Sequence, residues 1–170
     1  LFLHRKNNYI ESQQMKETIK RSKNKLIDNQ LKLKLKKSIK DRAEHLMIVD
    51  LMRNDIGKIA NPGTVKVDKL YEIKSYKTVH QMISKIKGEI DNSIREIDIL
   101  RALFPGGSIT GAPKESAMKI IDCLENYSRD IYTGSLGYIT SNGNMKFNIA
   151  IRTMTINNQI ASYPVGGGIV

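Results

Sequence analysis

A glutamate, an arginine, a tyrosine and a glycine run are the residues best suited to hold a small dianion. Glu44 shares an expected helical stripe with apolar residues, where a carboxylate is costly unless a cation, a metal ion or hydrogen-bond donors meet it. Arg152 lies on the polar side of an expected strand, where its guanidinium could bind a carboxylate through two parallel hydrogen bonds. Tyr132 could donate to an anion, and the glycines at 166–168 let backbone N–H groups approach a ligand. Spacing leaves an ordinary alternative open for each: a salt bridge for Glu44, a solvated side chain for Arg152, a half-buried core position for Tyr132 and a flexible turn for the glycines.

A second group of candidates carries weaker local signals. His80 could act as an acid, a base or a donor, although a single histidine is usually structural. Lys16 is one of 28 lysines and arginines, so its position alone predicts nothing. Ser108 lies in the glycine-rich stretch 104–114, whose Gly-Ala-Pro opens an apolar helix. Free N–H groups at such a helix start suit an anionic ligand, and an ordinary loop before a helix is the alternative.

Composition limits the class of protein. The 170 residues are 40% hydrophobic, enough for one domain with a core. The net charge of +11 is concentrated in a lysine-rich stretch at 32–40, and without tryptophan or a recognition motif nucleic acid is a weak partner candidate. One cysteine and no long apolar run indicate a reducing, cytoplasmic location without a membrane segment. The start on Leu1 and the stop at Val170 suggest a chain truncated at both ends.

The expected elements must position these residues. Alternation around Asn7-Asn8 predicts a hairpin over 1–11, followed by a loop over 14–25. Helical spacing predicts one long helix over 27–56, buried all round between 43 and 52. The remaining expected elements are extended segments at 64–76, a strand at 79–86, a helix at 94–103, a helix after Pro113 with Ala117, Ile120, Ile121 and Leu124 on its apolar face, and strands at 134–140, 145–156 and 159–165. This order favours an α+β fold of layered antiparallel sheets and helices.

Several long motifs resemble the chorismate-utilising enzymes. They are Asp-Arg-Ala-Glu-His-Leu-Met-Ile-Val-Asp-Leu-Met-Arg-Asn-Asp at 41–55, Pro-Gly-Gly-Ser-Ile-Thr-Gly-Ala-Pro-Lys at 105–114, Gly-Ser-Leu-Gly-Tyr at 134–138, Ile-Ala-Ile-Arg-Thr at 149–153 and the closing Gly-Gly-Gly-Ile-Val. The resemblance is colinear over 1–170, which it identifies as a chorismate-binding catalytic domain. The phrase at 104–114 is most similar to the aminodeoxychorismate synthases, with the anthranilate synthases as close relatives.

The resemblance implies a role for each candidate. Glu44 matches the ligand of a Mg²⁺ ion that bridges to the ring carboxylate of chorismate. Tyr132 and Arg152 match the pair that holds the enolpyruvyl carboxylate, with Gly168 donating its backbone N–H. Ser108 matches a hydroxyl that contacts the substrate, and His80 a histidine beside the ring. A Mg²⁺ ion that keeps several waters and takes few carboxylates is normal for this metal.

Lys16 distinguishes the two branches of the family. Aminodeoxychorismate synthases carry a Pro-Ile-Lys-Gly-Thr type motif, and anthranilate synthases have Ala instead of Lys; this chain has Gln-Met-Lys-Glu-Thr at 14–18. The resemblance implies that neutral Lys16 attacks chorismate at C2, with ammonia delivered by a glutamine amidotransferase subunit. Such a lysine needs a lowered pKa, which burial near cations can give and Glu17 opposes. An anthranilate synthase and a non-catalytic binding domain remain the alternatives.

Two further pieces of the family pattern fall outside the chain. Its acidic Ser-Pro-Glu motif would end just before Leu1, and its second magnesium-binding glutamate would follow Val170. The general acid and half of the metal shell therefore have no counterpart in residues 1–170.

Overall fold

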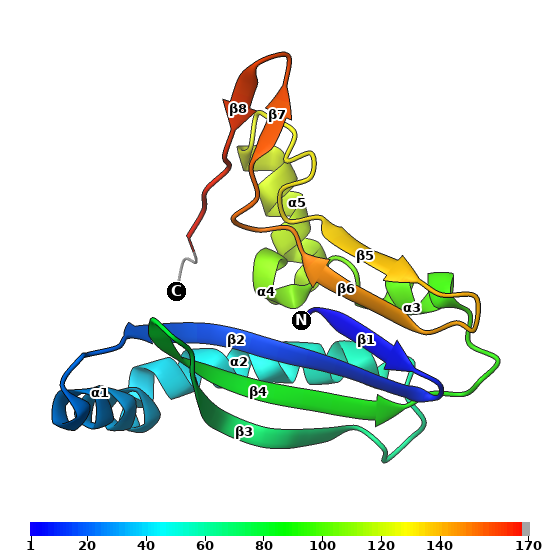
Figure 1. The fold of residues 1–170 in the computed structure, drawn as a ribbon. Coiled ribbons are helices and arrows are strands. Elements are labelled where there is room, and N and C mark those ends of the chain that lie inside the picture. The colour runs from blue at the N-terminus through cyan, green and yellow to red at the C-terminus, as the bar shows by residue number, and fades with distance from the viewer. Residues whose placement is uncertain (168–170) are drawn as a thin grey trace.

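The computed structural model describes residues 1–167 and contains a six-stranded antiparallel sheet (Figure 1). Its strands, in spatial order, are β3 (Lys66–Ser75), β4 (Val79–Glu89), β2 (Tyr9–Lys20), β1 (Leu3–Lys6), β6 (Met145–Ile149) and β5 (Ser135–Ile139). A separate two-stranded sheet pairs β7 (Thr155–Asn157) with β8 (Ile160–Ser162). The mixture of antiparallel sheet and helices confirms the predicted α+β class.

Five helices accompany the sheets in the described part of the chain. They are α1 (Lys25–Lys37), α2 (Ile39–Gly57), α3 (Glu96–Leu103), α4 (Gly107–Thr110) and α5 (Lys114–Leu124). Figure 1 shows α1 and α2 along the part of the sheet formed by β1 to β4, and α4 and α5 in a second lobe with β7, β8 and the β5–β6 end of the same sheet. Helix α3 lies in the chain between β4 and this lobe, and α2 contacts both α3 and α4.

The β1–β2 hairpin forms where alternation predicts it, with Asn7 at φ 55° in the turn. The expected loop over 14–25 is wrong, because β2 continues to Lys20 as a partner of β4. The polar side chains of Ser12 and Gln14 are buried on this strand and bond to each other. The strand is therefore maintained by a long-range ladder, which local composition does not reveal.

The expected single helix over 27–56 is two helices that meet at Ser38. Ser38 has an extended backbone, and its hydroxyl accepts the Asp41 N–H, so it caps α2. The expectation of complete burial between 43 and 52 is also wrong. Only one stripe of α2 is buried, containing His45, Val49, Met52 and Ile56, while Leu46 and Met47 are exposed.

The core lies between the sheet and helices α2 and α3. Its buried members are Phe2, Leu3, Ile10, Val49, Met52, Ile56, Ile86, Ile90, Ile99, Leu103 and Met145. Helix α5 contributes no buried residue, and its predicted apolar face is exposed at Ile120 and Leu124. Cys123 on the same helix is also exposed.

Candidate functional site

Lys16 occupies a β-bulge in β2. Met15 pairs with Ile83 and Thr18 with Gln81, so Lys16 and Glu17 together oppose a single residue of β4. A bulge changes the direction in which a side chain leaves its strand, and bulges are frequent beside active sites. Here the Lys16 Nζ donates a hydrogen bond to Glu44 Oε2 on α2 at 2.5 Å. The bulge therefore brings together two predicted site residues that are far apart in the sequence.

Glu44 is half-buried, and two lysines surround its carboxylate. Its Oε2 accepts from Lys16, and its Oε1 lies 3.8 Å from Nζ of exposed Lys40. The hydrogen bond from Lys16 is the main cause that holds the pKa of the Glu44 carboxyl below its ordinary value. The salt bridge that the sequence analysis left open at Glu44 is thus present, and Lys16 has an anionic neighbour instead of the expected cationic ones.

Glu44 has the chemistry of one ligand of a magnesium ion. Within residues 1–167 no group of three or more His, Cys, Asp and Glu side chains is placed to hold a metal. Mg²⁺ commonly takes one or two carboxylates and completes its shell with waters and substrate oxygens. The Glu44 carboxylate fits that requirement, because its Oε1 makes only a long contact with an exposed lysine.

Behind this pair lies a buried histidine that the sequence analysis did not assign. His45 is fully buried; its Nε2 hydrogen-bonds Ser84 Oγ at 2.8 Å, and its Nδ1 has no partner within residues 1–167. The same Ser84 oxygen accepts the Tyr71 N–H at 3.0 Å, in a bulge of β3 where Tyr71 has φ 59°. Burial, followed by the charge of Lys16, lowers the pKa of His45 to about 4. His45 is therefore neutral at physiological pH and supports the helix turn that carries Glu44.

His80 is almost completely buried on β4, and both of its ring nitrogens are engaged. Nδ1 lies 2.8 Å from the Ser75 hydroxyl, and Nε2 lies 3.1 Å from Asp28 Oδ1 on α1. Hydrogen bonds from Arg21 are the main cause that keeps the pKa of Asp28 well below its ordinary range. In this arrangement His80 fixes α1 to the sheet, and a catalytic role for it stays a prediction.

Ser108 lies on the short helix α4, where its side chain is exposed. The preceding residue, Gly107, is buried against Leu51 of α2, and a Cβ built on it would lie 3.2 Å from Leu51 Cβ. The close approach of α4 to α2 thus depends on this glycine. It presents Ser108 beside the helix that carries Glu44.

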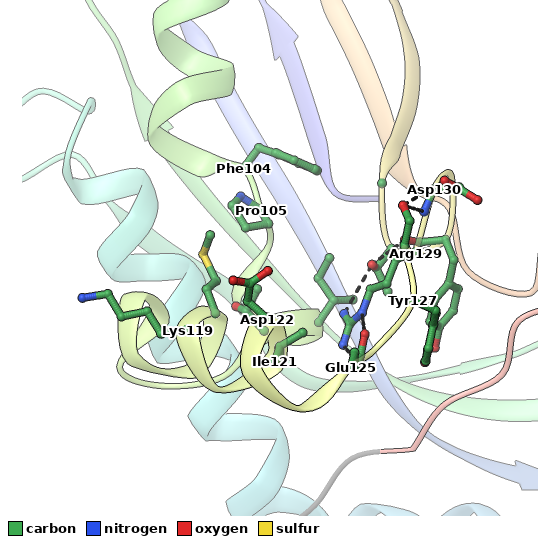
Figure 2. A pocket seen from close by; sticks show the side chains of 16 residues that line it. Phe104, Pro105, Lys119, Ile121, Asp122, Glu125, Tyr127, Arg129 and Asp130 are labelled. Carbon is green, nitrogen blue, oxygen red and sulfur yellow. Dashed lines mark hydrogen bonds and ion pairs between the residues drawn. The ribbon is translucent and has the colours of Figure 1, made fainter.

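Tyr132 lies in the connection between α5 and β5, and its hydroxyl contacts the glycine segment. A Cβ on Gly166 would collide with the Tyr132 oxygen, so these two predicted elements are adjacent. Tyr132 also borders a cavity of about 610 Å³ beside α5. Figure 2 shows this cavity, with Arg129 bound through two nitrogens to the Glu125 carboxylate. Gly168 itself lies outside the described residues.

Arg152 does not lie on a strand, so the expected strand over 145–156 is wrong. β6 ends at Ile149, and Ala150 bonds back to the segment before β5 through its N–H to Gly134 and its carbonyl oxygen to Thr133. The chain then bends at Arg152, which has φ 53° and an exposed side chain. Its predicted position on a strand face is corrected, and its role as a substrate ligand stays a prediction.

The structure therefore forms two local groups from the predicted residues. One joins Lys16 to Glu44, and the other joins Tyr132 to the glycine segment at Gly166. Of the predicted substrate residues, Tyr132 lines the cavity in Figure 2, and Ser108 and Arg152 do not.

Comparisons with known proteins agree with this fold and these motifs. The family profile described as chorismate binding enzyme matches residues 1–170. The chain is 48% identical over 165 residues to the chloroplastic aminodeoxychorismate synthase of Arabidopsis thaliana, covering 97% of this chain and 18% of that protein. It is 48% identical over 165 residues to aminodeoxychorismate synthase component 1 of Escherichia coli K12, covering 96% of this chain and 36% of that protein.

A solved structure gives the same result. The crystal structure of anthranilate synthase component I from Streptococcus pneumoniae superposes with a TM-score of 0.82 at 36% identity, covering 94% of this chain and 35% of that one. The chain thus shares the antiparallel α+β fold of this structure. It belongs to the chorismate binding enzyme family, and it spans between about a fifth and about a third of the length of these relatives.

Proposed function

We propose that the intact protein aminates chorismate at C4, as a component I of aminodeoxychorismate synthase type that serves para-aminobenzoate and folate synthesis. The observation that carries this proposal is the contact of 2.5 Å between the Lys16 Nζ and Glu44 Oε2. This contact supports the proposal, because Lys16, the proposed nucleophile, lies beside Glu44, the proposed metal ligand. The two 48% identical relatives bear the name of this activity, which supports the same choice.

The proposed chemistry uses Lys16 as a nucleophile that is regenerated. Neutral Lys16 forms a bond from Nζ to C2 of chorismate while the C4–O bond breaks and the hydroxyl leaves as water after protonation. Ammonia then forms the C4–N bond, and the bond between Nζ and C2 breaks to release the product. Mg²⁺ bound at Glu44 would neutralise the ring carboxylate and replace Lys16 as the partner of the glutamate.

Five residues complete the proposed site. Arg152, Tyr132 and the Gly168 N–H would hold the enolpyruvyl carboxylate, because a guanidinium, a phenol and a backbone amide all donate to such an anion. Ser108 would contact the substrate, and His80 would lie beside the ring. The adjacency of Tyr132 and Gly166 supports a shared carboxylate site for Tyr132 and the glycine segment.

Ammonia would come from a separate glutamine amidotransferase subunit, since the Escherichia coli relative is named as component 1. The described helices include none long and apolar enough to cross a bilayer. A cytoplasmic location is part of the proposal, whereas the Arabidopsis relative is described as chloroplastic. Replacing ammonium with glutamine in the assay tests the partner: turnover with glutamine should require the second subunit.

Anthranilate synthase is the second candidate, and two residues beside Lys16 favour it. Gln14 and Glu17 stand where the aminating motif has proline and glycine. Burial is the main cause that raises the pKa of Glu17, followed by the negative charge of Asp41. The aminating motif has glycine at this position, so the Glu17 carboxyl group beside Lys16 departs from that motif.

Product identification separates the two candidates. Intact protein with chorismate, Mg²⁺ and ammonium should yield aminodeoxychorismate, and Lys16→Met should abolish it. Lys40→Met is the matched control, because Lys40 approaches the same glutamate from an exposed position and should leave turnover unchanged. Anthranilate and pyruvate as the products, or full activity of Lys16→Met, would contradict the proposal.

A further inference from the structure

Two motif residues have no role in the proposed chemistry, and the structure joins them. Lys114 ends the Gly-Ala-Pro-Lys motif, and Asp55 ends the Arg-Asn-Asp motif. The Lys114 Nζ donates to Asp55 Oδ2 at 2.6 Å, between side chains that are 18% and 3% exposed. The other Asp55 oxygen accepts from Lys58 at 2.9 Å. This is a largely buried ion pair between the start of α5 and the end of α2.

Local helix energetics do not explain a lysine at this position. Lys114 is the first residue of α5, where a positive charge opposes the helix dipole. Its placement is therefore accounted for by the tertiary contact. The enclosed ammonium is directed at protein groups and away from solvent.

The same ammonium closes a loop. Besides Asp55, the Lys114 Nζ donates to the carbonyl oxygen of Leu103, the last residue of α3, at 3.4 Å. Residues 104–113, which include α4 and Ser108, lie between these two anchor points. Gly107 in this segment rests on Leu51 of α2. The two ends of the segment are thus held together by Lys114, and its middle packs against α2.

The residues of α2 that hold this segment lie in line with the proposed metal ligand. Asp55 follows Leu51 by one helical turn, and Leu51 follows Glu44 by two, so all three share a face of the helix. At about 1.5 Å of rise per residue, Leu51 lies about 10 Å along the axis from Glu44. The ion pair therefore fixes where the Ser108 segment sits along the face that carries Glu44.

We infer that Lys114 is a positioning residue, whose ion pair with Asp55 holds the Ser108 segment in register with Glu44. The inference rests on the proposed function for the substrate contact of Ser108. The attachment of the segment to α2 is independent of that function. The two parts can therefore be tested separately.

Hydrogen exchange of the intact protein tests the attachment. Lys114→Met should speed exchange in residues 104–112 by about tenfold or more, because hydrogen bonds to charged groups contribute that much to local opening. Lys66→Met, which replaces an exposed lysine on β3, is the control and should leave this exchange unchanged. Lys114→Arg should restore part of the protection. Unchanged exchange in Lys114→Met would overturn the inference.

Steady-state kinetics test the positioning. Lys114→Met should raise the KM for chorismate about tenfold with a smaller change in kcat, since the lysine acts through Ser108 and touches no reacting atom. A faster-exchanging segment with an unchanged KM would overturn the positioning role. A faster-exchanging segment in a protein that does not consume chorismate would refute the proposed function and leave the attachment supported.

A second variant covers the case in which Lys114→Met does not fold. Removing one partner of a buried ion pair leaves an uncompensated charge, which is strongly destabilising. The double variant Asp55→Asn with Lys114→Met removes that charge together with the tie. The segment should exchange as fast in the double variant as in the single one, and full protection in it would overturn the inference.

Discussion

Lowering the pH should destabilise this protein through His45, the buried histidine behind Glu44. Burial and the nearby charge of Lys16 lower its pKa from 6.5 to about 4. The unfolded chain therefore binds a proton at this residue below pH 6.5, whereas the folded chain does so only near pH 4. Stability is undiminished above pH 6.5 and decreases as the pH falls through this window.

The size of the effect follows from the difference between the two pKa values. At pH 5 the unfolded histidine is protonated, the folded one is mostly neutral, and each pH unit below 6.5 costs about 1.4 kcal/mol. The free energy of unfolding should thus decrease by about 2 kcal/mol between pH 7.5 and pH 5 on account of His45 alone. The charge of Lys16 acts in the same direction as burial, because a nearby cation disfavours the protonated ring.

Urea unfolding of the intact protein, followed by far-UV circular dichroism, measures this decrease. A chelator should be present at each pH, because His45 adjoins the proposed metal ligand. His45→Gln retains an amide that can bond Ser84 but cannot titrate. The decrease of about 2 kcal/mol in the free energy of unfolding between pH 7.5 and pH 5 should therefore be absent from this variant. His4→Gln, a partly exposed histidine on β1, is the matched control and should behave as the parent protein does. An equal loss of stability in the parent protein and in His45→Gln would refute this reasoning.

Three further predictions concern the site and the core. Gly166→Ala should raise the KM for chorismate, because the added Cβ collides with the Tyr132 hydroxyl; an unchanged KM in initial-rate assays would separate Tyr132 from substrate binding. Glu44→Gln should weaken Mg²⁺ binding by tenfold or more in titration calorimetry with chorismate present, and unaltered affinity would remove Glu44 from the metal shell. Leu103→Ala should lower the free energy of unfolding by about 2–5 kcal/mol in urea titrations, since the side chain is fully buried, and a loss well below this range would show that the core closes around the gap.

The features predicted best from the sequence are those determined by local chemistry. The turn at Asn7-Asn8 and the helix that follows Pro113 are both present, because backbone preference and missing donors act within a few residues. The cost of an unpaired carboxylate on a helix left a salt bridge open at Glu44 as one alternative, and the contact with Lys16 is such a bridge. The break at Ser38 carried a readable signal as well, namely a serine followed three residues later by an aspartate.

The features that could not be predicted depend on partners far away in the chain. β2 extends through polar residues because β4 pairs with it, and nothing in residues 14–20 shows that partner. The bulge that directs Lys16 toward Glu44 is a property of the register between the two strands. Arg152 leaves the sheet because the chain turns after Ala150, with the Ile151 N–H bonded to the Ile149 carbonyl oxygen and Arg152 at φ 53°, and alternation along the sequence does not show this turn.

A covalent adduct on Lys16 is the most direct test of the proposed amination. Intact protein incubated with chorismate and Mg²⁺ without ammonia should carry a chorismate-derived group on the peptide that contains residue 16, detectable by mass spectrometry. The group should disappear when ammonium is added, as aminodeoxychorismate forms, and it should be absent from Lys16→Met. Formation of product by a protein that never carries this group, or release of anthranilate instead, would contradict the account.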